Sequence, residues 1–471
     1  MDQPPESSLP SGPAMDASGV IMVLVTICVF LLPVLIYFPP MLPSKSEALL
    51  QTHSPVGLDP RQSRPHRCHE SSDAGADKSL PARLRSLWIY PIKSCKGIEL
   101  TESRVLPTGL EFDRLFTFAQ LKSPFPVRLD TPEEEKSRHQ WMFITQREYP
   151  LLATIQVDLF VPDLAKIRGH EAQADAASSE AFIVLRFPWV DRGWLGNLAW
   201  LVAKLSRGWR ALPEKEVVLP VCFPTAAEIE ERHYSFEEVT VWREAVTALN
   251  MESELPRELR LYLGVSNKLG IFRIDPARLR KLYRCAPAEA EAGYQPYVGF
   301  QDAYPLHLLN LSSARDLESK IPKDDELRHL DPRRFRANLI IDGPPAYTEE
   351  SWKQIRFTPA PSSVREAAES ARFHVSCRTV RCKMPNVDQD TGIRHPVQPD
   401  RAIRKFREVD AGAKGMGCLG MQLTPLYDEP DVSEAATMES WLEVGMGIEV
   451  LETGEHRYIP STKNQPEFQA K

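Results

Sequence analysis

The chain is poor in cysteine and has no excess of positive charge. Eight cysteines are spread over 471 residues, too few and too irregularly spaced for a disulfide framework, so we expect free thiols and a reducing compartment. The 57 Lys and Arg residues are outnumbered by 64 Asp and Glu residues, which gives a formal net charge of −7. No overall cationic field is available to attract a polyanion, and a nucleic-acid partner is therefore disfavoured.

Proline, in contrast, is in excess. The chain has 41 prolines, more than the usual share of about one residue in twenty. They predict long irregular connections rather than a helical bundle. Apolar residues at 42% and charged residues at 26% are close to the globular average, which excludes a wholly disordered, collagenous or polytopic membrane protein. The length allows two or three domains plus appendages.

Long hydrophobic runs are absent except near the N-terminus. Residues 19–38 carry no charged side chain over twenty positions, about the length needed to cross the hydrocarbon core of a bilayer. A cleaved secretory signal is the alternative, but residues 1–18 contain no Lys or Arg and no small-residue cleavage site is evident. We therefore favour a transmembrane anchor over residues 19–42. Positive charge first appears at Lys45, which predicts that the C-terminal part faces the cytosol.

Residues 43–82 are predicted to be a flexible linker. They are rich in Ser, Pro and charged residues and show no apolar period. Cys68 lies between His66 and His69 and could suggest a metal site, but no fourth ligand has a recognisable spacing. We interpret this cluster as accidental.

The rest of the chain is predicted to be α+β and predominantly β. From Leu84 onwards, short runs rich in β-branched and aromatic residues alternate with Gly, Pro and charged turns, which is typical of barrels and sandwiches. Residues 122–140 are predicted to be an inserted surface loop, and a second long excursion spans residues 162–220. A strand is expected to change into a helix at residues 311–313, where a serine could cap the helix.

The second excursion contains an apolar stretch with three tryptophans, residues 193–209 (GWLGNLAWLVAKLSRGW). Its apolar residues recur at helical spacing, which predicts a helix. The helix could pack its stripe on the domain, or it could rest on a membrane surface. We favour packing, because aromatic stripes at helical spacing usually belong to a core.

The densest cluster of reactive side chains lies at residues 376–392, SCRTVRCKMPNVDQDTG. Its two thiols, Cys377 and Cys382, lack the spacing of a zinc site or of a dithiol redox pair. The basic residues beside them are instead expected to lower the pKa of a thiol and to hold an anion. We therefore favour one thiolate that binds a metal carried by a phosphorylated cofactor.

Seven short segments are spread along the chain behind the apolar run. They are YPIKSCKG (90–97), GLEFDR (109–114), TQREYP (145–150), FQDAYPLHLLNLSS (300–313), RFRANLII (334–341), EESW (349–352) and RC-x4-VDQDTG (381–392). In this order they resemble the MOSC family, and most closely its membrane-anchored mitochondrial amidoxime-reducing components. The resemblance implies a tail (1–18) before the anchor, a MOSC N-terminal β-barrel domain with inserted loops (83–298), a MOSC β-barrel-like domain with flanking helices (299–452), and a tail (453–471).

The resemblance also implies a molybdenum cofactor, Mo-molybdopterin. In the family, a cysteine followed four residues later by VD-x-DTG binds molybdenum, and this position is Cys382, the implied catalytic residue. The implied cofactor contacts are Lys93, Ser94, Arg114, Tyr304, Arg336, Asn338 and Arg381. The guanidinium group of Arg, which can donate two parallel hydrogen bonds, and the compact ammonium charge of Lys suit a phosphate. An Asn amide suits the pterin edge. Cys377 lies off the family pattern, and its role stays open.

The implied function is a membrane-anchored oxidoreductase that removes oxygen from small N-hydroxylated substrates. Its implied electron donors are cytochrome b5 and cytochrome b5 reductase. The implied location is the mitochondrial outer membrane, with the endoplasmic reticulum as the alternative. A non-catalytic molybdenum-cofactor-binding or sulfur-carrier module at a membrane is the alternative function, since Ala303 stands where relatives have a hydroxyl and cannot supply a side-chain hydrogen bond.

Overall fold

The computed structural model describes residues 16–37, 44–58, 81–123, 130, 132, 134, 138–168, 180–242, 244–359, 370–427 and 438–460. The chain divides into two compact units. The smaller comprises residues 1–44 and 188–215, and the larger comprises residues 45–187 and 216–471. The His66, Cys68 and His69 cluster, most of the predicted loop before residue 138 and the end of the predicted C-terminal tail lie outside the described residues.

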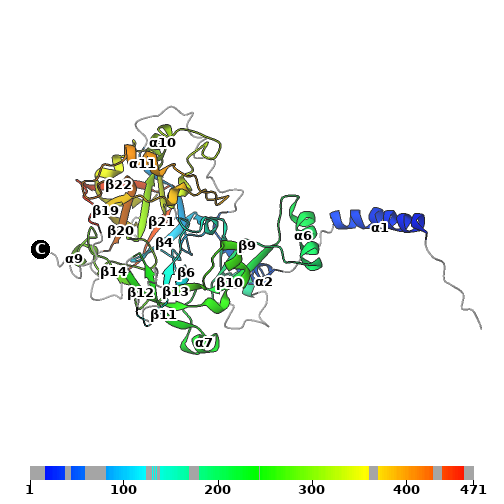
Figure 1. The fold of residues 1–471 in the computed structure, drawn as a ribbon. Helices are drawn as coiled ribbons and strands as arrows, with labels where there is room; N and C mark the ends of the chain where they lie inside the picture. Colours follow the sequence, from blue (N-terminus) through cyan, green and yellow to red (C-terminus); the bar gives the residue numbers. More distant parts are fainter. Residues whose placement is uncertain are drawn as a thin grey trace, which may run out of the picture. The chain divides into compact units, whose positions relative to one another are not determined.

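The larger unit is predominantly β, as predicted (Figure 1). Its main sheet has the strand order β17-β16-β20-β19-β18-β22-β2-β3, and an additional pairing of β2 with β17 joins the sheet into a ring. The strands are β2 (Arg83–Ile89), β3 (Ile98–Leu100), β16 (Leu306–Asn310), β17 (Leu339–Asp342), β18 (Trp352–Thr358), β19 (Arg372–Val380), β20 (Cys418–Leu426) and β22 (Gly447–Thr453). Every residue of β16 is buried, including the polar residues His307 and Asn310, so this strand shows no alternation of buried and exposed positions.

A second set of strands forms a closed barrel in the order β11-β12-β13-β6-β7. These strands are β6 (Phe116–Lys122), β7 (Gln140–Phe143), β11 (Ser235–Val241), β12 (Glu244–Asn250) and β13 (Leu269–Ile274). The rings of Trp141 and Phe272 pack edge to face inside it, with centroids 5.2 Å apart. This barrel confirms the prediction of β-barrel structure in the N-terminal half of the chain.

Three smaller sheets complete the β structure, in the orders β1-β8-β9-β10, β21-β4-β5 and β14-β15. Their strands are β1 (His53–Val56), β4 (Glu102–Leu106), β5 (Gly109–Leu110), β8 (Gln156–Pro162), β9 (Phe182–Pro188), β10 (Glu214–Pro220), β14 (Arg280–Lys281), β15 (Tyr297–Val298) and β21 (Ser440–Glu443). The strands of the predicted domains are interleaved. β2 and β3 precede the predicted boundary at residue 298, yet β2 pairs with β17 and β22, which follow it.

The helices are mostly short. The α-helices are α1 (Ala17–Tyr37), α2 (Lys45–Leu49), α5 (Leu164–Arg168), α6 (Trp194–Arg207), α7 (Ala226–Glu231), α8 (Arg257–Leu263), α9 (Glu289–Ala292), α10 (Leu311–Ser319) and α11 (Asp400–Phe406). The 3-10 helices are η2 (Pro150–Thr154), η4 (Glu252–Glu254), η5 (Pro332–Phe335), η6 (Thr348–Ser351) and η8 (Met384–Asn386). The predicted change from strand to helix occurs between β16 and α10, but the cap is Asn310 rather than a serine, because its side chain accepts from Ser312 N at 3.0 Å.

The predicted anchor falls on α1, a helix that contains Pro33 and has no acidic residue in its first turn and no basic residue in its last. Across the residues that the structure describes, no helix has the length and apolar character needed to cross a membrane. The structure therefore does not support the transmembrane anchor predicted for residues 19–42.

The predicted flexible linker is partly ordered, so this prediction was wrong for residues 45–58. Helix α2 forms there, and β1 pairs antiparallel with β8, from His53 opposite Pro162 to Val56 opposite Leu159. His53 is buried, and its Nε2 lies 2.8 Å from the Glu180 carbonyl oxygen. An edge strand tolerates proline and needs few apolar residues, which is why its sequence shows no apolar period.

The tryptophan-rich helix was predicted to pack its apolar stripe in a core, and within its own compact unit it does not. Helix α6 forms as expected, but Trp194 and Leu195 on it are 74% and 60% exposed.

Candidate functional site

Three ends of main-sheet strands meet at one place, and the candidate residues lie on the loops beside them. The backbone N–H of Trp88, near the end of β2, donates to the carbonyl of Asn338 at 2.8 Å. The N–H of Asn338, just before β17, donates to the carbonyl of His307 in β16 at 2.9 Å. Residues far apart in sequence are thereby brought together by backbone pairing alone.

Three of the predicted cofactor contacts have an unusual backbone. Ser94, Arg114 and Arg336 all lie in the left-handed region, with φ of 69°, 51° and 52°. Non-glycine residues rarely adopt this conformation, and where the surrounding structure enforces it the position is commonly functional. The shared conformation turns three loops sharply at the same site.

Arg114 is held by its neighbours on both sides. Its Nη1 lies 2.5 Å from Asp113 Oδ2 and donates to Asn338 Oδ1 at 3.0 Å, and its Nη2 donates to the carbonyl of Arg336 at 3.3 Å. The guanidinium also lies over the Tyr90 ring, 4.7 Å from the centroid. Asp113 additionally accepts from the N–H of Tyr90 at 2.8 Å, which ties β2 to this loop.

Arg336 is almost completely buried, with 5% of its surface exposed. Its Nη1 donates to the Cys95 carbonyl at 2.7 Å and to Gln389 Oε1 at 3.4 Å, and its guanidinium lies 4.1 Å from the centroid of Tyr90. Burial lowers the pKa of Arg336 to about 10. The side chain is therefore still a cation at neutral pH, although the ion pairs described in the structure give it no carboxylate partner.

Arg381 is a second buried guanidinium without a carboxylate in the described part of the chain. It donates to the carbonyls of Leu419 at 2.9 Å and Phe335 at 3.2 Å, and its Nη2 lies 2.6 Å from His307 Nε2. Burial lowers the pKa of His307 well below its usual value, and the charge of Arg381 lowers it further. A neutral imidazole thus accepts a hydrogen bond from Arg381.

A glycine makes room for this contact. Gly420 in β20 has a φ of +81°, and a Cβ there would lie 2.5 Å from the Leu308 carbonyl oxygen and would overlap His307 Nε2. A larger residue would displace the His307 ring. Gly420 therefore permits the close approach of His307 to the strand.

Lys93 differs from Arg336 and Arg381 because it has a carboxylate partner, Asp302. Its Nζ lies 2.5 Å from Asp302 Oδ1 and donates to the Phe300 carbonyl at 2.7 Å. Burial lowers the pKa of Lys93, while the charge of Asp302 opposes that effect. The side chain of Asp302 is about half exposed at 48% and also accepts from Trp242 Nε1 at 3.0 Å.

Cys382 follows Arg381 directly after β19 and is partly exposed. Its Sγ accepts from the backbone N–H of Met384 at 3.4 Å. Burial raises the pKa of the Cys382 thiol, and the Met384 N–H and the charge of Arg381 oppose this only in part. The prediction that basic neighbours lower the thiol pKa was therefore wrong in its net direction, because burial outweighs them.

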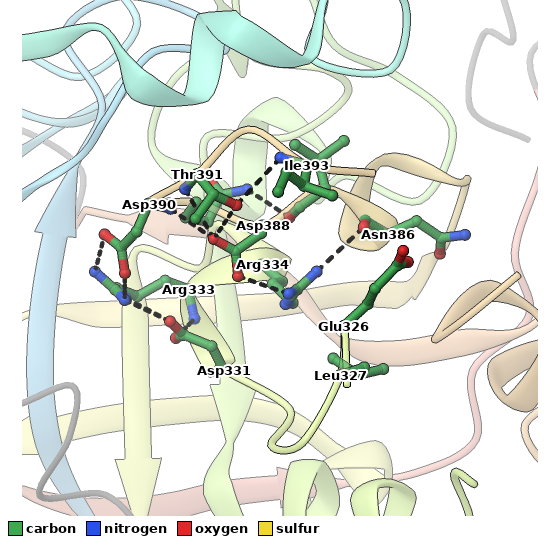
Figure 2. Close-up of polar contacts among 12 residues, drawn as sticks. Glu326, Leu327, Asp331, Arg333, Arg334, Asn386, Asp388, Asp390, Thr391 and Ile393 are labelled. Atoms are coloured by element: carbon green, nitrogen blue, oxygen red, sulfur yellow. Dashed lines mark hydrogen bonds and ion pairs between the residues drawn. The ribbon is translucent and has the colours of Figure 1, made fainter. Parts of the chain in front are cut away.

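The loop after Cys382 is clamped by two arginines (Figure 2). Asp388 Oδ1 accepts from the N–H groups of Asp390 and Thr391 at 3.1 and 2.9 Å, which closes a tight turn. Its Oδ2 lies 2.7 Å from Arg334 Nη2, and Asp390 lies 2.6 Å from Arg333 Nη2. The VD-x-DTG carboxylates thus act as structural groups that fix the loop to η5.

Two glutamines join this loop to two other segments. Gln146 Nε2 donates to Gln389 Oε1 and Gln389 Nε2 donates to Gln146 Oε1, both at 3.1 Å. Gln146 also donates to the Ser94 carbonyl at 2.8 Å. Both side chains are buried, so their amides hold the Lys93–Ser94 turn against the Cys382 loop.

The site has more buried positive than negative charge. Arg114 and Lys93 have carboxylate partners, whereas Arg336 and Arg381 donate to carbonyls, an amide and a neutral imidazole. A buried cation without a counter-ion is costly, so this set suits an anionic ligand. Beside it lies a thiol, a soft ligand for a metal. The residues present therefore fit a phosphorylated cofactor that carries molybdenum.

Tyr304 and Cys377 do not join this set. Tyr304 packs in a separate apolar cluster with Cys377, Cys285 and Ala303, and its buried hydroxyl lies among the thiols of Cys285 and Cys377. The structure thus brings together Lys93, Ser94, Arg114, Arg336, Asn338, Arg381 and Cys382, and it places Tyr304 elsewhere.

Several residues of the site were not singled out from the sequence. They are Tyr90, Asp113, Gln146, Asp302, His307, Gln389 and Gly420. Most of them lie inside the seven segments, so the segments were the available signal. Which member of a segment faces the site depends on strand register and loop direction, and neither is visible in a single sequence.

Two family models match the chain. The model described as "MOSC domain" matches residues 295–447, and the model described as "MOSC N-terminal beta barrel domain" matches residues 81–180. The first covers the Arg336 and Cys382 loops, and the second covers the Lys93 and Arg114 loops.

Curated relatives match most of the chain at low identity. "Mitochondrial amidoxime reducing component 2" of Rattus norvegicus is 22% identical over 372 residues, which are 78% of this chain and 81% of the relative. "Mitochondrial amidoxime-reducing component 1" of Homo sapiens is 26% identical over 69% of this chain and 72% of its own length. "Molybdenum cofactor sulfurase 1" of Aedes aegypti is 32% identical over 150 residues, only 16% of that protein.

Proposed function

Because the chain carries a MOSC N-terminal β-barrel domain followed by a MOSC domain, we propose that it is a molybdenum-dependent reductase of N-hydroxylated compounds. The domains and the relatives point to molybdenum cofactor binding. The reaction is inferred from the names of the amidoxime-reducing relatives.

The observation that carries the proposal is a pair of buried guanidinium groups that lie beside a thiol. In the described chain, neither group has a carboxylate partner. Arg336 and Arg381 are each over 90% buried, and their hydrogen bonds within the described chain go to uncharged groups. An anion at this point would compensate both charges, and Arg forks bind phosphate in two-pronged geometry. Cys382 lies next to Arg381 in sequence, so the same loop presents the anion contact and the metal ligand.

Each group has a separate role in this proposal. Arg114, Arg336 and Arg381 hold the phosphate, Asn338 binds the pterin edge, and Cys382 supplies the thiolate ligand. When bound, the molybdenum cofactor supplies two-electron oxygen-atom transfer. Asn338 is itself oriented by donating to the Trp88 carbonyl at 3.1 Å.

The proposed reaction consumes two electrons and two protons. An amidoxime, R–C(=NOH)NH2, takes up both, its N–O bond breaks, and the products are the amidine R–C(=NH)NH2 and water. Residues 415–420 match the pattern G-x-G-x-x-G. They lead from a turn into β20, whereas a dinucleotide-binding loop joins a strand to a helix. This segment therefore does not indicate a nicotinamide or flavin site, and we propose that the electrons come from another protein. We propose cytochrome b5 and cytochrome b5 reductase as the donors.

A non-catalytic cofactor-binding or sulfur-carrier module is the second candidate. Ala303 and Tyr304 support it, because both pack in the cluster around Cys377 and neither supplies a polar contact to the site. The matches to molybdenum cofactor sulfurases also lie in a stretch of only 150 to 160 residues of this chain.

One experiment separates the two candidates. The purified chain is analysed for molybdenum and pterin, and then assayed for reduction of an aryl amidoxime with a reduced low-potential dye as electron donor. The reductase proposal predicts turnover in proportion to molybdenum content. Stoichiometric molybdenum without turnover would support the carrier, and absence of both metal and pterin from a protein made in a cofactor-competent host would contradict both.

The location is also a proposal. We propose attachment to the mitochondrial outer membrane with the larger unit in the cytosol, supported by the mitochondrial names of the relatives. Protease added to intact mitochondria should then degrade the larger unit. Protection of that unit until the outer membrane is ruptured would contradict the proposed orientation.

A further inference from the structure

Helix α6 presents large apolar side chains to solvent. The exposed fractions are 74% for Trp194, 60% for Leu195, 49% for Leu198, 47% for Leu201 and 82% for Trp209, which follows the helix. Scattered apolar residues are normal on a protein surface, but five within sixteen consecutive positions, two of them tryptophan, are a contiguous apolar surface. We name these five residues the α6 face.

The buried residues of α6 are small. They are Gly196 and Ala203. A Cβ on Gly196 would overlap the carbonyl of Asp191, so the helix is in close contact with the preceding turn at this position. A surface helix normally buries its large apolar residues and exposes its small or polar ones. The reversed pattern in α6 leaves its large apolar residues available for a partner.

Tryptophan and positive charge are concentrated around this helix. Residues 188–215 contain four of the nine tryptophans and carry five Lys and Arg residues against two Asp and Glu residues, which is a net charge of +3 in a chain of −7. Lys215 and Arg207 pair with Asp191 and Glu214 at 3.0 and 2.8 Å. Across the described residues, no ion pair involves Arg192, Lys204 or Arg210.

The smaller unit contains a second exposed apolar helix. Most of the described side chains of α1 are apolar, such as Ile21 at 61% and Phe30 at 73% exposed, and they belong to the same compact unit as α6. Tryptophan favours the boundary between lipid headgroups and acyl chains, and free basic side chains complement anionic headgroups. The exposed tryptophans together with the local net charge of +3 favour an anionic lipid surface as the occupant of the α6 face.

We propose that the α6 face docks on a phospholipid membrane that contains anionic lipid. Helix α6 lies along the interface, with Trp194 and Trp209 at the level of the headgroups and acyl boundary. Lys204, whose Nζ lies 5.3 Å from the Trp200 ring centroid, and Arg210 contact lipid phosphates. This contact is separate from any membrane attachment through α1.

Tryptophan fluorescence tests the proposal on the full chain. Helix α1 contains no tryptophan, so its attachment to a membrane does not by itself place this fluorophore in the bilayer. The protein is bound to vesicles of phosphatidylcholine and phosphatidylserine with brominated acyl chains, which quench tryptophan on contact. We expect quenching relative to unbrominated vesicles, and weaker quenching when phosphatidylserine is omitted.

Two pairs of variants locate the quenched residues. Trp194→Phe with Trp209→Phe should remove most of the quenching, whereas Trp242→Phe, at a tryptophan 41% exposed in the larger unit, should leave it unchanged. Leu198→Glu with Leu201→Glu should abolish the quenching. Leu261→Glu on α8, also 50% exposed, is the matched control and should not.

If the α6 face does not bind lipid, the quenching and light-scattering results will differ from those expected above. Absence of quenching in the wild-type chain on anionic vesicles would overturn the proposal. A dimer in light scattering that dissociates in the Leu198→Glu, Leu201→Glu variant, without lipid quenching in the wild type, would assign the face to a second copy of this chain. Equal quenching in that variant and in the wild type would also overturn the proposal.

Discussion

The guanidinium of Arg114 donates to the backbone carbonyl of Arg336 at 3.3 Å, and both guanidinium groups lie over the ring of Tyr90. Two like charges are thus held together by one aromatic ring, although only Arg114 has a carboxylate beside it in the described structure. The Tyr90 face attracts cations but does not cancel their charge. An anionic ligand would relieve the remaining repulsion, and this makes Arg336 the most informative position to change.

Arg336→Ala should lose bound cofactor. A charge-assisted hydrogen bond contributes roughly 1.5 to 3 kcal/mol, so we expect pterin occupancy after dialysis to fall by about tenfold or more. Arg336→Lys should have intermediate pterin occupancy, because it keeps the charge but loses the paired hydrogen bonds of the guanidinium group. Released pterin fluorescence per mole of protein is the measurement. Arg328→Ala, at an arginine whose side chain is 75% exposed, is the control, and equal occupancy in all of these proteins would remove Arg336 from the cofactor site.

Cys382→Ser should fold normally and lose molybdenum-dependent turnover, because a hydroxyl is a harder and much less acidic ligand than a thiol. Cys377→Ser should have a milder effect, since Cys377 is buried in a different cluster, with Tyr304. Molybdenum content and amidoxime reduction are measured for both variants. Normal turnover in Cys382→Ser together with loss in Cys377→Ser would reverse the ligand assignment.

Gly420→Ala should weaken both the fold and the site. The added Cβ meets the Leu308 carbonyl and the His307 ring, and alanine is disfavoured at a φ of +81°. We expect a loss of at least about 1 kcal/mol in the free energy of unfolding, and lower pterin occupancy because His307 can no longer accept from Arg381. Gly415→Ala, also at positive φ but with no atom near its Cβ, controls for backbone strain alone. If both variants kept full occupancy, the contact between His307 and Arg381 would be irrelevant to binding.

Stability should fall between about pH 6.5 and pH 4, in part because of His374. Burial, together with the smaller effects of Lys353 and His456, lowers the pKa of His374 to about 4. Below about pH 6.5 the unfolded chain takes up a proton that folded His374 does not bind, so the free energy of unfolding decreases as pH falls, by an amount on the order of 3 kcal/mol. Urea unfolding at pH 7 and pH 4.5 measures the loss. His374→Gln should lose less over this interval than the wild type, and an identical pH dependence would contradict the assignment.

Much of the site could be read from the sequence because its members lie in short segments of unusual composition. Arg336 and Asn338 share one segment, and Arg381 and Cys382 share another, so their proximity to each other needed no tertiary information. Sequence periodicity likewise identified α6, and the short β-branched and aromatic runs indicated a predominantly β structure. The sequence did not identify the ordered strand β1, because an edge strand with one buried residue has no apolar period.

Residue type and local spacing were enough to predict the predominance of β structure, the MOSC segments and the cysteine beside an arginine. Tertiary structure alone decided which charges are compensated. Asp302 lies beside Lys93, 209 positions away along the chain, while Arg336 and Arg381 have only neutral acceptors around them in the described residues. It also decided that Tyr304 packs with Cys377 and that α6 exposes its tryptophans. Burial and counter-ion placement arise from strand pairing between distant segments, and no local pattern encodes them.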